Sequence, residues 1–373
     1  VYISTCATDA RGVSGAFLAT ELPWLRAHFV RVLVCGCHGM VEVADSIPAS
    51  LPLRGSRWQA VPAAFGALFS RDLYRELAHL ARDRRLSPTR AAKLLAFAIR
   101  GRMLSRWVRP WVRDAEQTVF YSFWMSYDAY AAALLKRRFP KARAIARGHA
   151  FDIDAQRNPM NPYLMKRERL QVLALGSTGA ETAERFPAPS YIDGVFRVVS
   201  CSSVIAIKQL PLLIDALSLW SRGRLRWTHI GGGADEAAVR AYAAQKLGAR
   251  PEIDFQLTGA VDHARVEALY AAQPFDVFVN TSRSEGVPVS IMEAMRAGIP
   301  IVAPNLGGIP ELVDSQIGVL YAPGGGAQAV LAALLAIADL PPQKAEFMRA
   351  AAQARWNRQC RSDALLERLF PQV

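Results

Sequence analysis

The chain has no long apolar run. None of its stretches reaches the roughly 18 consecutive apolar residues that a bilayer-spanning helix needs. The longest, "AAKLLAFAI" and "AVLAALLAIA", are amphipathic or short. No secretory signal peptide is visible at the beginning of the sequence either. These absences predict a protein without a membrane span, located in the cytoplasm.

Cysteine is scarce. The five cysteines are Cys6, Cys35, Cys37, Cys201 and Cys360. Their number is odd, they form no Cys-x-x-Cys motif, and most lie in apolar, strand-like runs, which predicts reduced thiols in a cytosolic protein. The stretch "VCGCHG" could suggest a metal site, but without further ligands it is better explained as buried core. We expect neither a metal nor a cofactor.

The sequence contains no internal repeat and no low-complexity tract. Its 373 residues exceed what one hydrophobic core usually holds, which predicts two domains. With 51% hydrophobic and 21% charged residues, the composition is that of a globular protein with an ample core.

Acidic residues are fewer than basic ones, and the net charge is +13. Residues 82–113 contribute +9 of this charge, from ten Arg or Lys and one Asp, and leave +4 for the rest of the chain. Apolar residues, including Trp107 and Trp111, interleave with these arginines. A basic helix with tryptophans fits an anionic membrane surface, on the inner face of the plasma membrane. A solvated helical face is the equal alternative, and a polyanion such as nucleic acid ranks third.

Short apolar runs alternate with helical patterns, which predicts an α/β fold with parallel sheets. The expected strands are 1–5, 31–36, 118–123, 142–147, 170–176, 196–201, 225–231, 253–259, 275–280 and 299–304. The expected helices include 16–28, 127–138, 209–221, 234–247, 262–272 and 288–297. A proline- and glycine-containing stretch, "RFPAPSYIDGVF", marks the expected domain boundary.

Two glutamates, Glu285 and Glu293, flank the start of a short helix in "SEGVPVSIMEAMRAGIP". Pro288 suits the first turn of that helix, and Gly298 with Pro300 ends it. If the whole stretch were helical, the carboxylates would lie roughly 12 Å apart, too far for the acid/base pair of a glycosidase. The wider gap fits two ends of a long ligand with an anion held at the helix N-terminus. The alternative is a surface helix in which Glu293 faces Arg296.

A longer stretch that includes this helix, "NTSRSEGVPVSIMEAMRAGIPIVAPNLGGIPELVD", resembles the signature of retaining glycosyltransferases of family 4, the group 1 class with the GT-B fold. The resemblance covers most of the chain, most strongly residues 196–322. It implies two doubly wound, Rossmann-like domains that face an interdomain cleft. Residues 1–190 would bind the acceptor, residues 191–354 would bind the nucleotide-sugar donor, and a C-terminal helix at about 355–373 would pack back on the first domain.

The resemblance also implies roles for residues of the second half. Glu293 would bind the ribose hydroxyls and Glu285 the hydroxyls of the donor sugar. Lys208 would neutralise the leaving diphosphate. Backbone amides at the helix start would face the diphosphate or the sugar. These are the amides of Gly286, Val287 and Val289.

Two features depart from the family pattern. Ser203 occupies a donor-site position where the family usually has a second cation, an arginine. The stretch near residues 187–195 is also shorter than the corresponding part of the family. The first departure predicts either a compensating basic residue or weaker stabilisation of the diphosphate. The loop "LTGAV", which ends at Val261, is expected to line the base.

In the first half, "ARGHAFDID" resembles the family's Arg-x-His segment, which implies that His149 contacts the sugar as a catalytic residue. Asp152 would orient His149 or bind the acceptor. A metal-binding Asp-x-Asp formed with Asp154 is the alternative that the GT-B resemblance disfavours. Gly12 and Gly15 are expected in the first strand-to-helix loop, where glycine lets the backbone approach a phosphate.

The resemblance therefore implies a retaining, metal-independent, hexosyltransferase-type glycosyltransferase. It would move a sugar from a nucleoside diphosphate sugar to a glycan or lipid-linked acceptor in cell-surface polysaccharide synthesis. One alternative is a hydrolysing nucleotide-sugar epimerase of the same fold. Another is a non-catalytic membrane- or polyanion-binding protein, for which the serine at position 203 is the best support.

Overall fold

The computed structural model describes residues 2–6, 13–36, 57–122, 125–147, 171–173 and 193–370. Two compact units make up the chain: Val1–Gly179 together with Leu366–Val373, and Ala180–Leu365. The domain limits expected at residues 190 and 354 differ from this division. Each unit is built around a parallel β-sheet, as the alternation of strand and helix patterns predicts. Among the described residues no helix is both long enough and apolar enough to cross a membrane.

The first unit has a five-stranded sheet in the order β2-β1-β3-β4-β5. Its strands are β1 (Tyr2–Cys6), β2 (Val32–Gly36), β3 (Val119–Ser122), β4 (Arg143–Arg147) and β5 (Gln171–Leu173). Each overlaps one of the five runs expected in the first half of the sequence. Helix α1 (Val13–His28) connects β1 to β2, and α5 (Tyr127–Arg138) connects β3 to β4. Parallel strands require a crossover connection of this kind, which is usually a helix.

Neighbouring residues of β3 face the two sides of this sheet, because side chains alternate along a strand. Phe120 belongs to a buried cluster with residues of α4 (Pro88–Val108) and α5. Tyr121 points to the other side, where its ring meets Phe370 at 6.2 Å and its hydroxyl donates to Glu21 of α1. The sheet is therefore covered on both faces.

The basic segment 82–113 contains the whole of α4 and a following 3-10 turn, η1 (Arg109–Trp111). A stripe at helical spacing along α4 is buried: Leu94, Ala98, Gly101, Leu104 and Val108. Trp107 and Trp111 pack partly buried against the same core. Both rings therefore cover part of the core of the first unit, because burying a large ring there is more favourable than exposing it, and the membrane contact of residues 82–113 stays a prediction.

The second unit has a six-stranded parallel sheet in the order β11-β10-β9-β6-β7-β8. Its strands are β6 (Val195–Cys201), β7 (Arg224–Ile230), β8 (Ile253–Leu257), β9 (Val277–Val279), β10 (Ile301–Pro304) and β11 (Gly318–Tyr321). The strand β11 was missed because it begins with a glycine and is short. Its glycine has a packing reason, since a Cβ at Gly318 would lie 2.1 Å from the Ile301 carbonyl oxygen.

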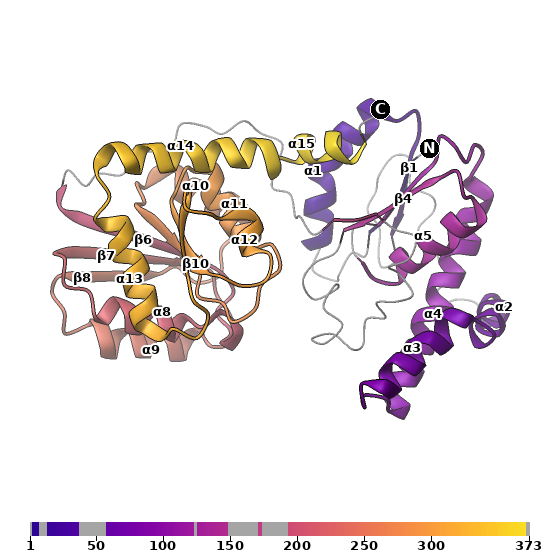
Figure 1. Ribbon diagram of the computed structural model, residues 1–373, viewed down its shortest axis with the longest axis horizontal. Coiled ribbons are helices and arrows are strands. Elements are labelled where there is room, and N and C mark those ends of the chain that lie inside the picture. The colour runs from indigo at the N-terminus through magenta and orange to yellow at the C-terminus, as the bar shows by residue number, and fades with distance from the viewer. Residues whose placement is uncertain are drawn as a thin grey trace. The chain divides into compact units, whose positions relative to one another are not determined.

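Helices cover both faces of this second sheet (Figure 1). On one side α8 (Leu210–Ser218), α9 (Glu236–Leu247) and α13 (Gly326–Ala338) share a large apolar core with the strands. Helices α10 (His263–Ala272), α11 (Val289–Arg296), α12 (Ile309–Leu312) and α14 (Pro342–Gln359) lie on the other side. The unit is therefore doubly wound.

Helix α14 packs within the second unit. Its Met348, Ala352 and Trp356 are buried, and Arg349 donates to the carbonyl oxygen of Phe275 at 2.9 Å. The following helix, α15 (Ser362–Leu369), leads into the first unit. There Phe370 stacks near Trp24, and Arg143 donates to the carbonyl oxygen of Leu369 at 2.6 Å.

Candidate functional site

The candidate site lies at the carboxyl ends of β6 and β9 in the second unit. These neighbouring strands mark the point where the strand order reverses, because β7 and β8 extend from β6 on one side and β10 and β11 from β9 on the other. Ligands of doubly wound sheets bind at such a switch point. The loop after β6 carries Lys208 at the end of a short 3-10 turn, Ala206–Lys208, and the loop after β9 carries Glu285.

Lys208 and Glu285 form an ion pair. The Lys208 Nζ donates to Glu285 Oε1 at 2.6 Å, and the two side chains are 23% and 10% exposed. Asn280, the residue that follows β9, also donates through its amide to Glu285 Oε1, at 3.3 Å. Two residues expected to touch neighbouring parts of a donor, its diphosphate and its sugar, are therefore held together on a partly exposed surface.

Backbone contacts fix these two loops to each other. The Thr281 hydroxyl donates to the carbonyl oxygen of Lys208 at 2.9 Å. The amide of Arg283 donates to the carbonyl oxygen of Ile207 at 2.8 Å. Gln209, which follows Lys208, has the left-handed φ of 49° that reverses the chain into α8. The position of the lysine thus depends on tertiary contacts more than on its own helix.

A glycine pair supports the Glu285 loop from the other side. The turn after β10 brings Gly307, with φ of +57°, so close that a Cβ there would lie 2.1 Å from the Glu285 carbonyl oxygen. The amide of Gly308 donates to the carbonyl oxygen of Gly286 at 2.8 Å. The "GGIPE" sequence therefore has a steric reason: only glycine allows this approach of two backbones.

Glu293 lies on α11 in a largely apolar setting. Its side chain is 15% exposed, and its Oε1 lies 3.3 Å from His263 Nδ1. The pKa of Glu293 is raised to about 7, chiefly by burial and also by the nearby Glu267 carboxylate, while Arg296 opposes the shift. Arg296 itself pairs with Glu267 on α10. The alternative placed Glu293 on a surface helix, facing Arg296. Arg296 is close to Glu293, but the Glu293 side chain is largely buried, so this alternative is wrong.

The remaining residues predicted for the donor site in this unit lie at the start of α11 and in the loop after β6. Gly286, Val287 and Val289 are half-buried at the start of α11, which begins at Val289 after Pro288 as the N-cap. Ser203 is exposed in the loop after β6, and its carbonyl oxygen accepts from the Ile205 amide at 3.1 Å.

The loops after β7 and β8 are held together by glycine. Gly231 pairs with Gly259, and a Cβ at Gly232 would lie 2.6 Å from the Ala260 amide nitrogen. A Cβ at Gly233 would meet the Val204 carbonyl oxygen at 2.4 Å. The glycine-rich turn is thus required for packing between loops. Val261, expected to line a base, is half-buried just beyond this turn.

Several predicted residues cannot be placed. Gly12, His149, Asp152 and Asp154 lie outside the described residues. Gly15 lies in α1, within the first turn of that helix and not in the loop where we expected it, because α1 begins at Val13. Within the described part of the chain, no group of three or more His, Cys, Asp or Glu side chains is arranged to hold a metal ion.

Three site residues escaped the sequence analysis: Asn280, His263 and Glu267. Asn280 had a usable signal, since it is the last residue of a predicted strand, 275–280, and so lies at the binding edge of the sheet. His263 and Glu267 had none, because their helix α10 meets Glu293 only through tertiary packing.

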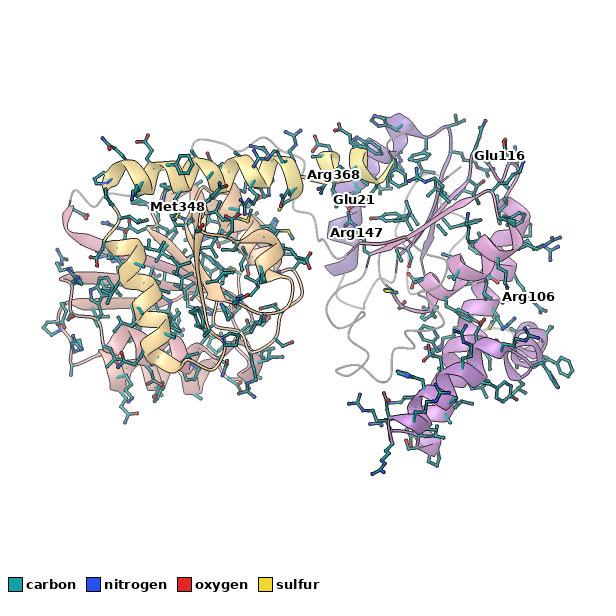
Figure 2. All side chains as sticks on the ribbon, in the orientation of Figure 1. Glu21, Arg106, Glu116, Arg147, Met348 and Arg368 are labelled. Carbon is teal, nitrogen blue, oxygen red and sulfur yellow. The ribbon has the colours of Figure 1, made fainter. Side chains whose placement is uncertain are left out.

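In the first unit, a buried ion pair joins Glu21 of α1 to Arg147 at the end of β4 (Figure 2). Both side chains are almost completely buried, and the Tyr121 hydroxyl donates to Glu21 Oε2 at 3.2 Å. Arg147 is the arginine of the "ARGH" motif. Its described contacts are structural: it ties the end of β4 to α1.

Comparison with known proteins agrees with this geometry. Residues 196–339 match the model of the family described as Glycosyl transferases group 1. The amylovoran biosynthesis glycosyltransferase AmsK of Erwinia amylovora is 29% identical over 153 residues, 38% of this chain and 36% of AmsK. The putative colanic acid biosynthesis glycosyltransferase WcaL of Salmonella typhimurium is 48% identical over 50 residues, 13% of this chain and 12% of WcaL. The matches thus span about a third or less of these relatives' length.

Solved structures extend the similarity to the whole chain at the level of fold. The lipopolysaccharide outer core galactosyltransferase WaaB in its apo form superposes with a TM-score of 0.65 at 13% identity, covering 100% of both chains. HepE of Anabaena, in complex with UDP and glucose, superposes with a TM-score of 0.55 at 18% identity, covering 100% of this chain and 99% of HepE. The fold is therefore GT-B, and residues 196–339 are similar to the family of group 1 glycosyl transferases.

Proposed function

We propose that this protein is a retaining, metal-independent glycosyltransferase. It moves a sugar from a nucleoside diphosphate sugar to a glycan or lipid-linked acceptor in the cytoplasm, in the synthesis of a cell-surface polysaccharide. The observation that carries the proposal is the convergence of Lys208 and Glu285 at the switch point between β6 and β9. The names of AmsK and WcaL, both polysaccharide biosynthesis glycosyltransferases, support the choice of pathway class.

In this proposal the ion pair opens when the donor binds. Lys208 then turns from Glu285 to the diphosphate, where a cation stabilises the charge that develops on the leaving group. Glu285 accepts hydrogen bonds from sugar hydroxyls, and Glu293 accepts them from the ribose diol. The amides at the start of α11 add partial positive charge beside the diphosphate.

The transfer exchanges one bond for another at the anomeric carbon. The bond from that carbon to the diphosphate oxygen breaks, and the acceptor oxygen forms its bond on the same face. The acceptor proton passes to the departing phosphate oxygen, so no protein nucleophile is needed. His149 and Asp152 remain proposed contacts of the sugar and the acceptor, and Gly12 and Gly15 remain proposed neighbours of the donor.

Titration calorimetry against UDP-, GDP- and ADP-sugars, with and without EDTA, tests the proposal. The UDP-sugars come first because the HepE structure holds UDP. We expect micromolar binding of one base, unaffected by EDTA, lost in Glu293→Ala and kept in the control Glu346→Ala, an exposed glutamate of α14. Binding that requires a metal would contradict the metal-independent mechanism. Absence of binding to every donor would favour the non-catalytic alternative, and donor conversion without an acceptor would favour the epimerase.

A further inference from the structure

Large apolar side chains are exposed along one face of α2 (Arg57–Leu68). Val61, Phe65, Leu68 and the following Phe69 are 57%, 65%, 44% and 72% exposed. Their spacing places them on one face of a helix. The rings of Phe65 and Phe69 lie together, with centroids 4.7 Å apart. This apolar stripe is thus continuous and turned to solvent.

On the opposite face of α2, the described residues are small. Ala63 and Ala67 are fully buried, and Gly66 approaches the Arg102 side chain of α4. A surface helix of a globular protein normally turns its large apolar residues inward. Helix α2 does the reverse, and an apolar stripe exposed in this way marks a surface for interaction.

The stripe continues directly into a cationic helix, α3 (Arg71–Arg82). The exposed residues of α3 share one side of the helix: Arg71, Tyr74, Arg75, Ala78, Ala81 and Arg82. The acidic residues of α3 point elsewhere. Glu76 is buried, and Asp72 accepts a hydrogen bond from the Tyr130 hydroxyl at 3.0 Å. The outward side of α3 is therefore positively charged.

We propose that the apolar stripe of α2 and the cationic face of α3 dock this protein on the surface of an anionic lipid bilayer. The side chains of α2 enter the boundary between headgroups and acyl chains, and the arginines of α3 contact anionic headgroups. Val61 and Leu68 favour lipid over nucleic acid, because an aliphatic side chain gains from hydrocarbon but offers no ring to stack on a base. This surface is proposed in addition to residues 82–113, which it meets at Arg82, and it is independent of the proposed donor site.

Vesicle flotation of the full chain tests the proposal. Vesicles of phosphatidylcholine alone are compared with vesicles that also contain phosphatidylglycerol, at two salt concentrations. The apolar variant is Phe65→Ser/Phe69→Ser, and its matched control is Phe347→Ser, because Phe347 is 64% exposed on α14 of the other unit. The charge variant is Arg71→Gln/Arg75→Gln/Arg82→Gln. Its control removes the same charge from exposed arginines of the second unit, Arg224, Arg265 and Arg358.

We expect binding to the anionic vesicles that weakens with salt and falls about tenfold or more in each α2 or α3 variant, with both controls close to the native protein. Equal losses in variant and control would overturn the proposal. So would unchanged vesicle binding in the phenylalanine variant. If light scattering shows that the native protein is a dimer which that variant converts to a monomer while vesicle binding persists, a second copy covers the stripe and the lipid proposal fails.

Discussion

Lys208 Nζ and Glu285 Oε1 lie 2.6 Å apart although the two residues are 77 positions apart in the sequence. Lys208 follows β6 and Glu285 follows β9, and these two strands pair with each other in the middle of the sheet. The pair is partly exposed, so an anionic ligand can compete with Glu285 for the lysine. The ion pair holds Lys208 at the switch point between β6 and β9, where we propose that the diphosphate binds.

Removal of the lysine charge should therefore slow sugar transfer more than it weakens the fold. We expect Lys208→Ala to lower kcat by about 10²–10³, the usual cost of removing one electrostatic stabiliser of a developing charge. Lys208→Arg should recover part of the loss. Steady-state kinetics with the donor found by calorimetry provide the measurement, and Lys344→Ala, at an exposed lysine of α14, is the control. A kcat unaffected by Lys208→Ala would contradict the assigned role.

Donor binding should weaken in acid as Glu293 becomes protonated. Burial raises the pKa of Glu293 from 4.5 to about 7, so the carboxylate that accepts two hydroxyl donors is fully present only above that pH. Affinity should fall by up to about tenfold per pH unit below 7. Glu267→Gln removes a neighbouring negative charge and should move the midpoint to lower pH. Calorimetry between pH 5 and 8 measures both, and an affinity independent of pH would contradict the assignment.

The same carboxylate should destabilise the ligand-free protein at high pH. Because its folded-state pKa lies above the unfolded value, the folded state binds more protons between the two, and stability falls as the pH rises through about 7. Glu293→Gln should then increase the free energy of unfolding at pH 8, by on the order of 3 kcal/mol, and change it little at pH 4. Urea titrations at the two pH values give the comparison. Equal effects at both would show that burial does not act on the charge.

Gly307 should tolerate alanine far less than a glycine in open space. Both Gly307 and Gly324 have a positive φ, +57° and +81°, but nothing lies within 4 Å of a Cβ at Gly324. Gly324→Ala should cost roughly 1–2 kcal/mol of backbone strain. Gly307→Ala carries the same strain and also forces the Glu285 loop to move, which should add about 1–3 kcal/mol and weaken donor binding. Thermal unfolding and calorimetry of the two variants test this, and equal behaviour would be the contrary result.

Breaking the buried ion pair of the first unit should be costly. Glu21→Gln leaves the Arg147 charge without its carboxylate partner in a dry interior, which should reduce the free energy of unfolding by about 3–5 kcal/mol. The double variant Glu21→Leu/Arg147→Met removes both charges and should lose less. Chemical denaturation of the two variants measures the difference. A double variant as unstable as the single one would mean that packing, not charge, dominates there.

The alternation of short apolar runs and helical patterns was sufficient to predict the parallel α/β fold, because strand and helix periodicity are local properties of the chain. Lys208 and Glu285 were expected in loops that follow strands, and they lie in such loops at the binding edge of the parallel sheet, whereas their roles stay predictions. The limits of α11 were predicted to within one residue at each end, from Pro288 and Gly298.

Only the tertiary structure decided which distant residues meet. His263 faces Glu293 across two helices, and Gly307 approaches Glu285 from another loop. The tertiary structure also determined which apolar side chains are buried: Trp107 packs against the core, whereas Phe65 is exposed. Periodicity identifies an apolar face of a helix, but whether that face is buried depends on what the rest of the chain places against it.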